Sequence, residues 1–377
     1  MENNSPSVII IGAGPAGLAV AGCLRAKGLD FVMLEQGEGV GESWRRHYDR
    51  LHLHTVKELS HLPGLPFPDA YPRYVSRDQL VAYMENYADH FDIRPLFGQA
   101  VRKIYRAGGG WKVECASGQS WESANVILAM GLNRRPFIPE FNGLDTFAGE
   151  VLHSSRYRNA GPFKGKKVLV VGMGNSGAEI ALDLCEQGVE TALSVRGPVN
   201  IVPRDVLGRP TQLTALALAK LPPWLGDRLG VLLRAITVGD LSKYGIKTPD
   251  MPPAQQLRET GQTPVIDLGT LKQIRSGNIK VFPAIERIAG GAIHFADGTS
   301  GSFDGLLLAT GFRPDLEDFL GDTKGLLDEH GCPVDVIGTG NWDGLYFVGF
   351  DNYITGGILG AIRRDAVRVA GHLAGQI

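Results

Sequence analysis

Cysteine is scarce in this sequence, and its four cysteines lie far apart. They are Cys23, Cys115, Cys185 and Cys332, so neither a CxxC redox pair nor a local zinc-binding cluster can form. This usage excludes an internal disulfide-exchange centre and fits the reducing environment of the cytoplasm. Residues 1–7 also lack the basic region and the apolar run of a secretion signal, so we expect a cytoplasmic protein.

Neither an excess of charge of one sign nor a long apolar run is present. The 38 basic and 40 acidic residues give a net charge of −2, which creates no field that would attract nucleic acid or an anionic membrane. We therefore expect small-molecule partners and no nucleic acid. Charged residues and prolines interrupt the most apolar stretch, residues 213–238, before it reaches the length of a membrane span, about 18 residues.

Residues 213–238 therefore predict two short amphipathic helices and no transmembrane segment. We expect these helices to cover the site. The same pattern would suit a docking face for a second subunit or for a membrane surface, so a homodimer stays open.

Glycine, in contrast, is abundant, with 50 residues among 377, well above the usual share of about 7%. Residues 7–11 are an apolar, β-branched run that leads into Gly12-Ala13-Gly14-Pro15-Ala16-Gly17, followed by a helical pattern over 18–26 and a second strand over 31–34. Residues 167–171 repeat this arrangement. They lead into Gly172-Met173-Gly174-Asn175-Ser176-Gly177, a helix to about residue 186 and a strand over 191–195.

Two βαβ units predict an α/β fold with two Rossmann-like, three-layer dinucleotide-binding domains. Each unit is followed by short strands and then by an apolar strand that ends in glycine, at residues 127–131 and 307–311. A last strand over 345–348 and a helix from about residue 357 would complete the first domain. We expect the first domain at 1–159 and 312–377. The second domain, at 160–311, is inserted into it and carries a helical insertion at about 210–240.

In a GxGxxG turn the first glycine permits the turn, the second lets a pyrophosphate approach the backbone, and the third lets helix and strand pack closely. The phosphates then lie at the helix N-terminus, where unpaired N–H groups and the helix dipole favour negative charge. One match in a glycine-rich chain is also explained by an ordinary strand-to-helix turn. Two matches in the same strand-turn-helix context are poorly explained by accident.

The residue that follows the second strand of each unit separates the two nucleotides. Glu35 stands there in the first unit, and its carboxylate would accept hydrogen bonds from ribose hydroxyls, as FAD requires. Arg196 holds the matching place in the second unit, where its guanidinium would pair with the 2′-phosphate of NADPH. We expect FAD in the first domain and NADPH in the second. A solvated loop cation is the alternative interpretation of Arg196.

A further motif lies just before the second nucleotide unit. Phe147-x-Gly149-x-x-x-His153-x-x-x-Tyr157 resembles the motif of class B flavin-dependent monooxygenases. The chain as a whole resembles the plant YUCCA-type flavin monooxygenases, which carry FAD, use NADPH and convert indole-3-pyruvate to indole-3-acetate. The stretches that carry this likeness are residues 48–51, 65–68, 165–172, 203–205 and 263–277.

The resemblance implies a reaction. An NADPH-dependent monooxygenase of this type forms a C4a-hydroperoxyflavin with O2, and here it would decarboxylate an aryl 2-oxo acid such as indole-3-pyruvate. N- or S-oxygenation of a small amine or sulfide is the alternative within the class. An NADPH–flavin reductase that feeds electrons to a protein partner is the alternative from another class.

The motifs and the resemblance together select the candidate site residues. For cofactor binding these are Gly12, Gly14, Pro15, Ala16, Gly17, Glu35, Gln36, Trp44, His54, Gly131, Gly172, Gly174, Asn175, Ser176, Gly177, Arg196, Thr310, Gly311, Gly357, Ile358 and Leu359. Lys57 and Asn175 are the candidates for a direct part in the flavin-mediated reaction, although Asn175 and Ser176 would equally cap their helix.

Other residues have plainer interpretations. Trp44 would otherwise be a core aromatic, and His153 is interpreted as a structural residue that positions the nucleotide domain. We predict no metal, because His52, His54 and His61 form no recognisable ligand set. The sequence departs from the YUCCA pattern at Arg363-Arg364, before Asp365, and over residues 351–357. The resemblance places both stretches close to the flavin and the substrate.

Overall fold

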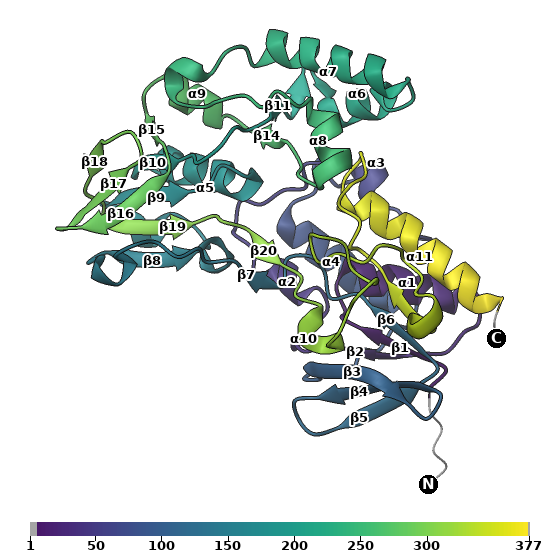
Figure 1. Ribbon diagram of the computed structural model, residues 1–377. Helices are drawn as coiled ribbons and strands as arrows, with labels where there is room; N and C mark the ends of the chain where they lie inside the picture. The colour runs from purple at the N-terminus through teal and green to yellow at the C-terminus, as the bar shows by residue number, and fades with distance from the viewer. Residues whose placement is uncertain (1–5, 376–377) are drawn as a thin grey trace. The chain divides into compact units, whose positions relative to one another are not determined.

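The computed structural model describes residues 6–375, and the chain forms two compact units (Figure 1). Unit 1 consists of Met1–Arg46, Thr55–Arg135 and Phe312–Ile377. Unit 2 consists of His47–His54 and Pro136–Gly311. The α/β class expected from the sequence is confirmed, because each unit contains a parallel sheet covered by helices.

Unit 1 is built on a four-stranded parallel sheet in the order β2-β1-β6-β21. Its strands are β1 (Val8–Ile11), β2 (Val32–Leu34), β6 (Asn125–Leu128) and β21 (Leu345–Phe347). The register pairs Ile10 with Met33 on one side and with Ile127 on the other. The last strand of the chain therefore lies in the first sheet, beside β6.

Layers cover both faces of this sheet, and nearly every position of its four strands is buried. The helices are α1 (Pro15–Arg25), α4 (Arg77–His90) and α11 (Ile358–Ala374). An antiparallel sheet of β3 (Val101–Ala107), β4 (Gly110–Cys115) and β5 (Ser120–Ser123) covers the other face. Ile9 and Ile11 pack with Trp111 and Val113 of β4, so the alternate positions of β1 face the helices.

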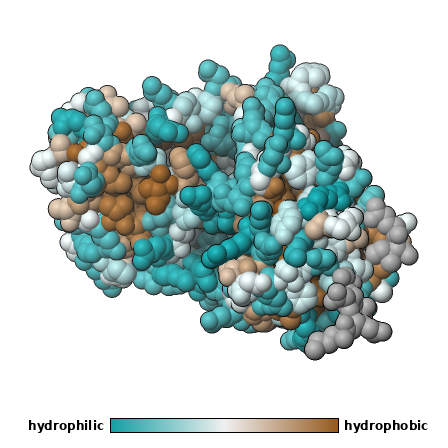
Figure 2. Space-filling view, turned by 60° about the horizontal axis from the view of Figure 1, so that its bottom comes forward, coloured by the Kyte–Doolittle hydropathy of each residue, from teal (hydrophilic) through white to brown (hydrophobic). Residues whose placement is uncertain are grey.

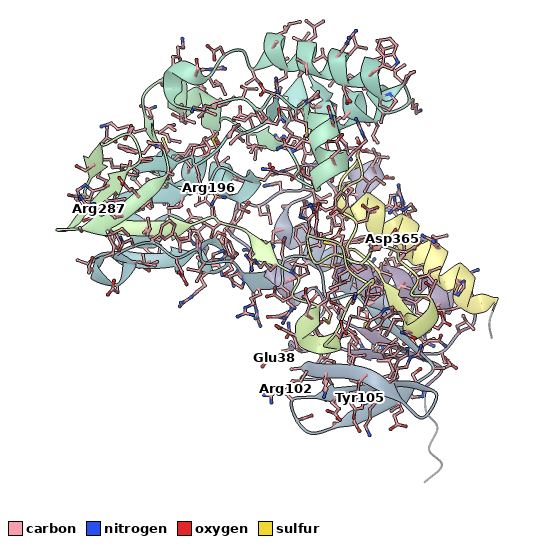
Figure 3. The ribbon with its side chains drawn as sticks, in the orientation of Figure 1. Glu38, Arg102, Tyr105, Arg196, Arg287 and Asp365 are labelled. Carbon is pink, nitrogen blue, oxygen red and sulfur yellow. The ribbon has the colours of Figure 1, made fainter. Side chains whose placement is uncertain are left out.

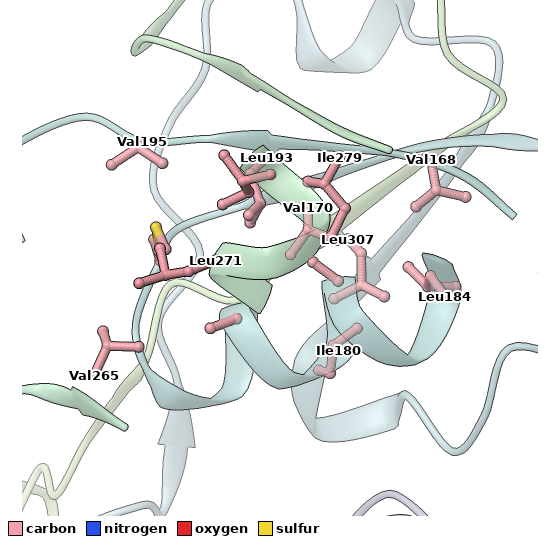
Figure 4. Packing of buried hydrophobic residues seen from close by; sticks show 14 of the residues in the cluster. Val168, Val170, Ile180, Leu184, Leu193, Val195, Val265, Leu271, Ile279 and Leu307 are labelled. Atoms are coloured by element: carbon pink, nitrogen blue, oxygen red, sulfur yellow. The ribbon is translucent and has the colours of Figure 1, made fainter. Parts of the chain in front are cut away.

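Unit 2 repeats this plan with a five-stranded parallel sheet in the order β15-β10-β9-β19-β8. Its strands are β8 (Glu150–His153), β9 (Lys167–Val171), β10 (Glu190–Ser194), β15 (Ile279–Phe282) and β19 (Gly305–Leu308). The helices α5 (Asn175–Glu186) and α9 (Thr270–Arg275) cover one face, where Val168, Val170 and Leu193 pack against Ile180 and Leu184 (Figure 4). An antiparallel sheet of β16 (Ile285–Ala289), β17 (Ala292–Phe295) and β18 (Ser300–Gly301) covers the other face.

The stretch 213–238 forms two helices, as predicted. They are α6 (Thr211–Leu218) and α7 (Pro223–Thr237), and Pro223 is the first residue of α7. A third helix, α8 (Pro253–Thr260), packs against α7. Within residues 6–375, no helix combines the length and apolar character that crossing a membrane requires.

Some apolar side chains remain exposed on unit 2. On α7, Trp224 is 62% and Ile236 is 72% exposed. Apolar residues also gather at the left of Figure 2, on the side where the edge strand β8 lies in Figure 1. Val151 of β8 is 39% exposed, as expected for a strand with a neighbour on one side only.

Candidate functional site

The two glycine turns have nearly the same local geometry. Gly12 and Gly172 have φ of +104° and +102°, which favours glycine over any residue with a Cβ. A Cβ on Gly12 would lie 2.7 Å from the carbonyl oxygen of Ala129, and one on Gly172 would lie 2.5 Å from that of Ala309. The residues that follow β6 and β19, Ala129 and Ala309, thus lie in close contact with the two turns. This contact explains why both apolar strands continue into similar sequences.

The third glycine of each turn provides close packing inside the βαβ unit. A Cβ on Gly17 would lie 1.9 Å from the carbonyl oxygen of Gly12, and one on Gly177 would lie 2.0 Å from that of Gly172. No side chain fits at either position. The first and third glycines are therefore required for the turn and for its packing, and they do not by themselves form a contact with a ligand.

The middle glycines, Gly14 and Gly174, face open space. They are the N-cap residues of α1 and α5, with nearly identical backbone angles, and neither helix has a side-chain cap. A Cβ at either position would have no neighbouring atom within 4 Å. Each helix therefore offers unpaired N–H groups beside an uncrowded backbone, and the residues present fit a dinucleotide pyrophosphate at both turns.

The two residues expected at the ribose have different surroundings. Glu35 is 7% exposed, and its carboxylate accepts hydrogen bonds of 2.7 Å from the backbone N–H groups of Ala13 and Gly37. Each carboxylate oxygen keeps a second lone pair that a ribose hydroxyl can use. Arg196 lies two residues beyond β10, is exposed, and forms no ion pair with any residue in the range 6–375 (Figure 3). Its guanidinium is thus free to receive a phosphate.

Asn175 does not cap α5. Its Oδ1 accepts a hydrogen bond of 2.7 Å from the N–H of Ile266, and its Nδ2 donates to the carbonyl oxygen of Pro264 at 3.3 Å. The side chain thereby ties the start of α5 to β14 (Val265–Asp267). The N-capping alternative for Asn175 and Ser176 is wrong, because the N-cap position belongs to Gly174 and no side chain caps the helix.

In unit 1, α11 begins beside the segment around Thr55. Gly357 is the N-cap residue, with φ of +93°, and a Cβ there would lie 2.7 Å from Cγ2 of Thr55. Ile358 and Leu359 lie in the first turn of the helix. This turn contains no acidic residue, and no side chain caps the helix. The helix therefore begins with unpaired N–H groups and a favourable dipole for negative charge.

Other candidates of unit 1 lie on short elements. Trp44 belongs to α2 (Glu42–Arg45) and is partly exposed, so it is not a buried core aromatic. Lys57 opens α3 (Lys57–Ser60), and its ammonium donates to the carbonyl oxygens of Asp69 at 2.8 Å and Tyr71 at 2.9 Å. Gln36 is exposed, and Gly131 follows β6 with φ of +76°.

The motif before the second nucleotide unit consists of packing positions. A Cβ on Gly149 would lie 2.5 Å from the carbonyl oxygen of Asp304. Tyr157 is 1% exposed and donates a hydrogen bond of 2.6 Å to Asp183 of α5. Phe147 packs against the apolar cluster between the two sheets of unit 2. The motif therefore anchors β8 and the chain after it to the second nucleotide unit.

His153 completes this motif from the end of β8. It is 6% exposed, and its Nδ1 accepts a hydrogen bond of 3.1 Å from the backbone N–H of Ser155. Its Nε2 then carries the proton and donates to the carbonyl oxygen of Gly311 at 3.2 Å. Thr310, just before Gly311, donates its hydroxyl to the carbonyl oxygen of Phe137. His153 thus fixes the position of Gly311, which follows the apolar strand β19 of unit 2.

Burial lowers the pKa of His153 below its ordinary value near 6.5. A neutral imidazole that is harder to protonate in the folded state stabilises the fold fully above about pH 6.5, and this contribution is lost as the pH falls. We predict that the melting temperature of His153→Gln falls less between pH 7 and pH 5 than that of the wild type. The exposed His90→Gln is the control, and equal pH slopes in all three proteins would contradict the role assigned to His153.

A buried polar cluster on α5 was missed by sequence reasoning. Glu179 is 3% exposed and accepts hydrogen bonds from the Tyr48 hydroxyl at 2.8 Å and from Nε2 of His54 at 3.3 Å. Burial, and then the charge of Glu179, raise the pKa of Tyr48, which keeps its hydroxyl protonated as the donor. Arg50 pairs with Asp183 and Glu186 on the same helix.

This cluster explains the sequence stretch 48–51. Tyr48 and Arg50 bind acidic residues of α5, and Asp49 accepts a hydrogen bond of 2.7 Å from Asn159. Residues 47–54 therefore belong to unit 2 although their flanking segments belong to unit 1. The available signal was a pair of acidic residues four apart, Glu179 and Asp183, among the apolar residues in the middle of a helix.

Comparisons with known proteins place this geometry in a family. The family model described as "Pyridine nucleotide-disulphide oxidoreductase" matches residues 9–206. Indole-3-pyruvate monooxygenase YUCCA1 of Oryza sativa subsp. japonica is 40% identical over 372 residues, which cover 97% of this chain and 90% of that protein. The probable indole-3-pyruvate monooxygenase YUCCA3 of Arabidopsis thaliana is 38% identical over 383 residues, which cover 98% of this chain and 86% of that protein.

The chain belongs to the YUCCA family of monooxygenases. It is an FAD- and NADPH-dependent monooxygenase that acts on a small molecule. Solved structures agree in fold. A flavin-containing monooxygenase from Stenotrophomonas maltophilia superposes with a TM-score of 0.76 at 24% identity, covering 99% of both chains. Cyclohexanone monooxygenase bound to epsilon-caprolactone superposes with a TM-score of 0.72 at 19% identity, covering 98% of this chain and 87% of that one.

Proposed function

We propose that this protein converts an aryl 2-oxo acid, such as indole-3-pyruvate, into the acid that is one carbon shorter. O2 is the co-substrate, one oxygen atom enters the product acid, and the other leaves as water. The 2-oxo acid, O2, NADPH and a proton become the shorter acid, CO2, NADP⁺ and water. The proposal rests chiefly on identity over nearly the whole chain to YUCCA proteins named for indole-3-pyruvate.

The assignment of nucleotides follows from the two turns. We assign FAD to the turn at Gly12–Gly17, where Glu35 can accept hydrogen bonds from the ribose. We assign NADPH to the turn at Gly172–Gly177, where Arg196 supplies an unpaired guanidinium for the 2′-phosphate. The remaining candidate residues, apart from Lys57, keep their roles as predictions.

When bound, the flavin would supply the redox chemistry that links NADPH to O2. The chain itself binds and orients. The N-terminus of α11, at Gly357, can stabilise negative charge on a group beside it by about 0.3–1 kcal/mol. Lys57 has two of its three N–H bonds committed to backbone carbonyl oxygens, so we assign it to holding residues 57–71 in place.

A homodimer and a cytoplasmic location stay predictions. The proposed reaction does not depend on a second copy, because both phosphate-binding turns belong to one chain. All four cysteines lie in the described part of the chain, all are free, and none neighbours another in sequence. This arrangement disfavours a reductase that works through a pair of thiols.

A substrate panel tests this proposal. Indole-3-pyruvate and phenylpyruvate should be consumed with release of CO2, whereas trimethylamine and a thioether should give little oxygenated product. Product masses and NADPH consumption are recorded for each compound. Oxygenation of the amine or the thioether alone would make heteroatom oxygenation the function. Flavin reduction that supports only a protein acceptor would favour a reductase.

A further inference from the structure

Two adjacent arginines on α11 mark a departure from the YUCCA pattern, and only one of them has acidic partners. Arg364 binds Asp351 at 2.6 Å and Asp365 at 2.8 Å. Asp365 is 1% exposed, so Arg364 compensates a buried carboxylate. Arg364 therefore has a structural role within unit 1, and its charge is neutralised.

Arg363 has a different environment. It is half-buried, and its Nη1 lies 3.2 Å from Nε2 of His61. Nδ1 of His61 lies 2.9 Å from the carbonyl oxygen of Leu62, so Nδ1 must be the ring atom that carries the proton. Nε2 is then the acceptor of the hydrogen bond from Arg363, and this hydrogen bond holds the guanidinium in place.

No acidic residue within 6–375 forms an ion pair with Arg363. Of the acids on its own helix and on α3, Asp365 is paired with Arg364, and Glu58 is exposed. A half-buried guanidinium that binds no carboxylate has lost water without gaining a counter-ion. Such a group is prepared to bind an anion that arrives with a ligand.

The position of Arg363 relates it to the proposed flavin site. Arg363 follows Leu359 by four residues, so the two side chains lie on the same face of α11, one turn of about 5.4 Å apart. The first turn of α11 begins beside Thr55, and α3 packs against the same helix. An anion bound to Arg363 would therefore lie about one helical turn from the first turn of α11.

We propose that Arg363 binds the carboxylate of the 2-oxo acid substrate, with His61 as the residue that positions its guanidinium. This inference rests on the proposed function. The guanidinium would select 2-oxo acids over neutral ketones of the same shape. A charge-assisted contact of this kind changes affinity by about ten- to a hundredfold.

Equilibrium binding tests the proposal without turnover. The probes are 3-(indol-3-yl)propionate, an unreactive isostere of indole-3-pyruvate, and its neutral amide, titrated into the FAD-loaded protein by calorimetry. In Arg363→Gln the dissociation constant of the acid should rise about ten- to a hundredfold, and that of the amide should stay within about twofold. The KM for indole-3-pyruvate should rise by a similar factor, while the rate of flavin reduction by NADPH is unchanged.

The matched control is Arg368→Gln on the same helix, whose guanidinium pairs with Asp335 at 2.9 Å. It should bind both probes as the wild type does. Arg363→Lys retains the charge and should lose less acid affinity than Arg363→Gln. Acid binding that is unchanged in Arg363→Gln, or a loss that is equal for acid and amide in both Arg363 variants, would overturn the proposal. Failure of the proposed function would look different, because wild-type protein would then not decarboxylate the 2-oxo acid.

Discussion

Gly174→Ala is expected to remove tight NADPH binding while FAD stays bound. A Cβ at this position meets no protein atom within 4 Å, so the fold can accept it. The methyl group would instead enter the space in which a pyrophosphate approaches the helix N-terminus. Displacing two charge-assisted hydrogen bonds of about 1.5–3 kcal/mol each predicts a loss of affinity of about a hundredfold or more.

The measurement is anaerobic reduction of the flavin as a function of NADPH concentration. Gly14→Ala is the matched variant, because Gly14 occupies the same place in the first turn and also faces open space. Purified Gly14→Ala should be folded but colourless, whereas Gly174→Ala should be yellow and slow to reduce. A colourless Gly174→Ala protein would contradict the assignment of the two nucleotides to the two turns.

Arg196→Ala is expected to weaken NADPH binding by about ten- to a hundredfold and to leave NADH binding unchanged. The side chain is exposed and has no ion pair with another described residue, so its removal should not disturb unit 2. The lost interaction is the charge-assisted contact with the 2′-phosphate, which NADH lacks. Kd values for both nucleotides are measured from the concentration dependence of flavin reduction.

Arg287→Ala is a suitable control for Arg196→Ala. Arg287 is another exposed arginine of unit 2 and lies on β16 (Figure 3). The Arg287→Ala substitution removes the same charge from the protein but leaves the proposed contact between Arg196 and the 2′-phosphate in place. An NADPH preference that survives in Arg196→Ala, or that is lost to the same extent in Arg287→Ala, would count against the assignment.

Local features of the fold could be predicted from the sequence because they depend on a few neighbouring residues. The strand at 167–171 and the helix that ends at Glu186 lie where the pattern predicts them. The glycine motifs encode positive φ at Gly12 and Gly172, which fixes the turn and hence the start of each helix. Pro222 and Pro223 likewise separate α6 from α7.

Long-range partners could not be predicted from such patterns. The hydrogen bond between Tyr48 and Glu179 joins residues that are 131 positions apart, and the one between Asn175 and Ile266 spans 91 positions. The sequence shows Glu179 and Asp183 four residues apart on one helix, but it does not show that residues 47–54 dock onto α5 and supply their partners. For the same reason, the sequence showed that Arg363 departs from the family but not that Arg364 alone would find acidic partners.

Turnover of indole-3-pyruvate under ¹⁸O2, with NADPH as the reductant, tests the proposed monooxygenase reaction directly. Each molecule of indole-3-acetate should carry one ¹⁸O atom and should be accompanied by one CO2 and one oxidised NADPH. NADPH oxidation that yields only hydrogen peroxide or water, with indole-3-pyruvate intact or with product free of ¹⁸O, would contradict the proposed reaction.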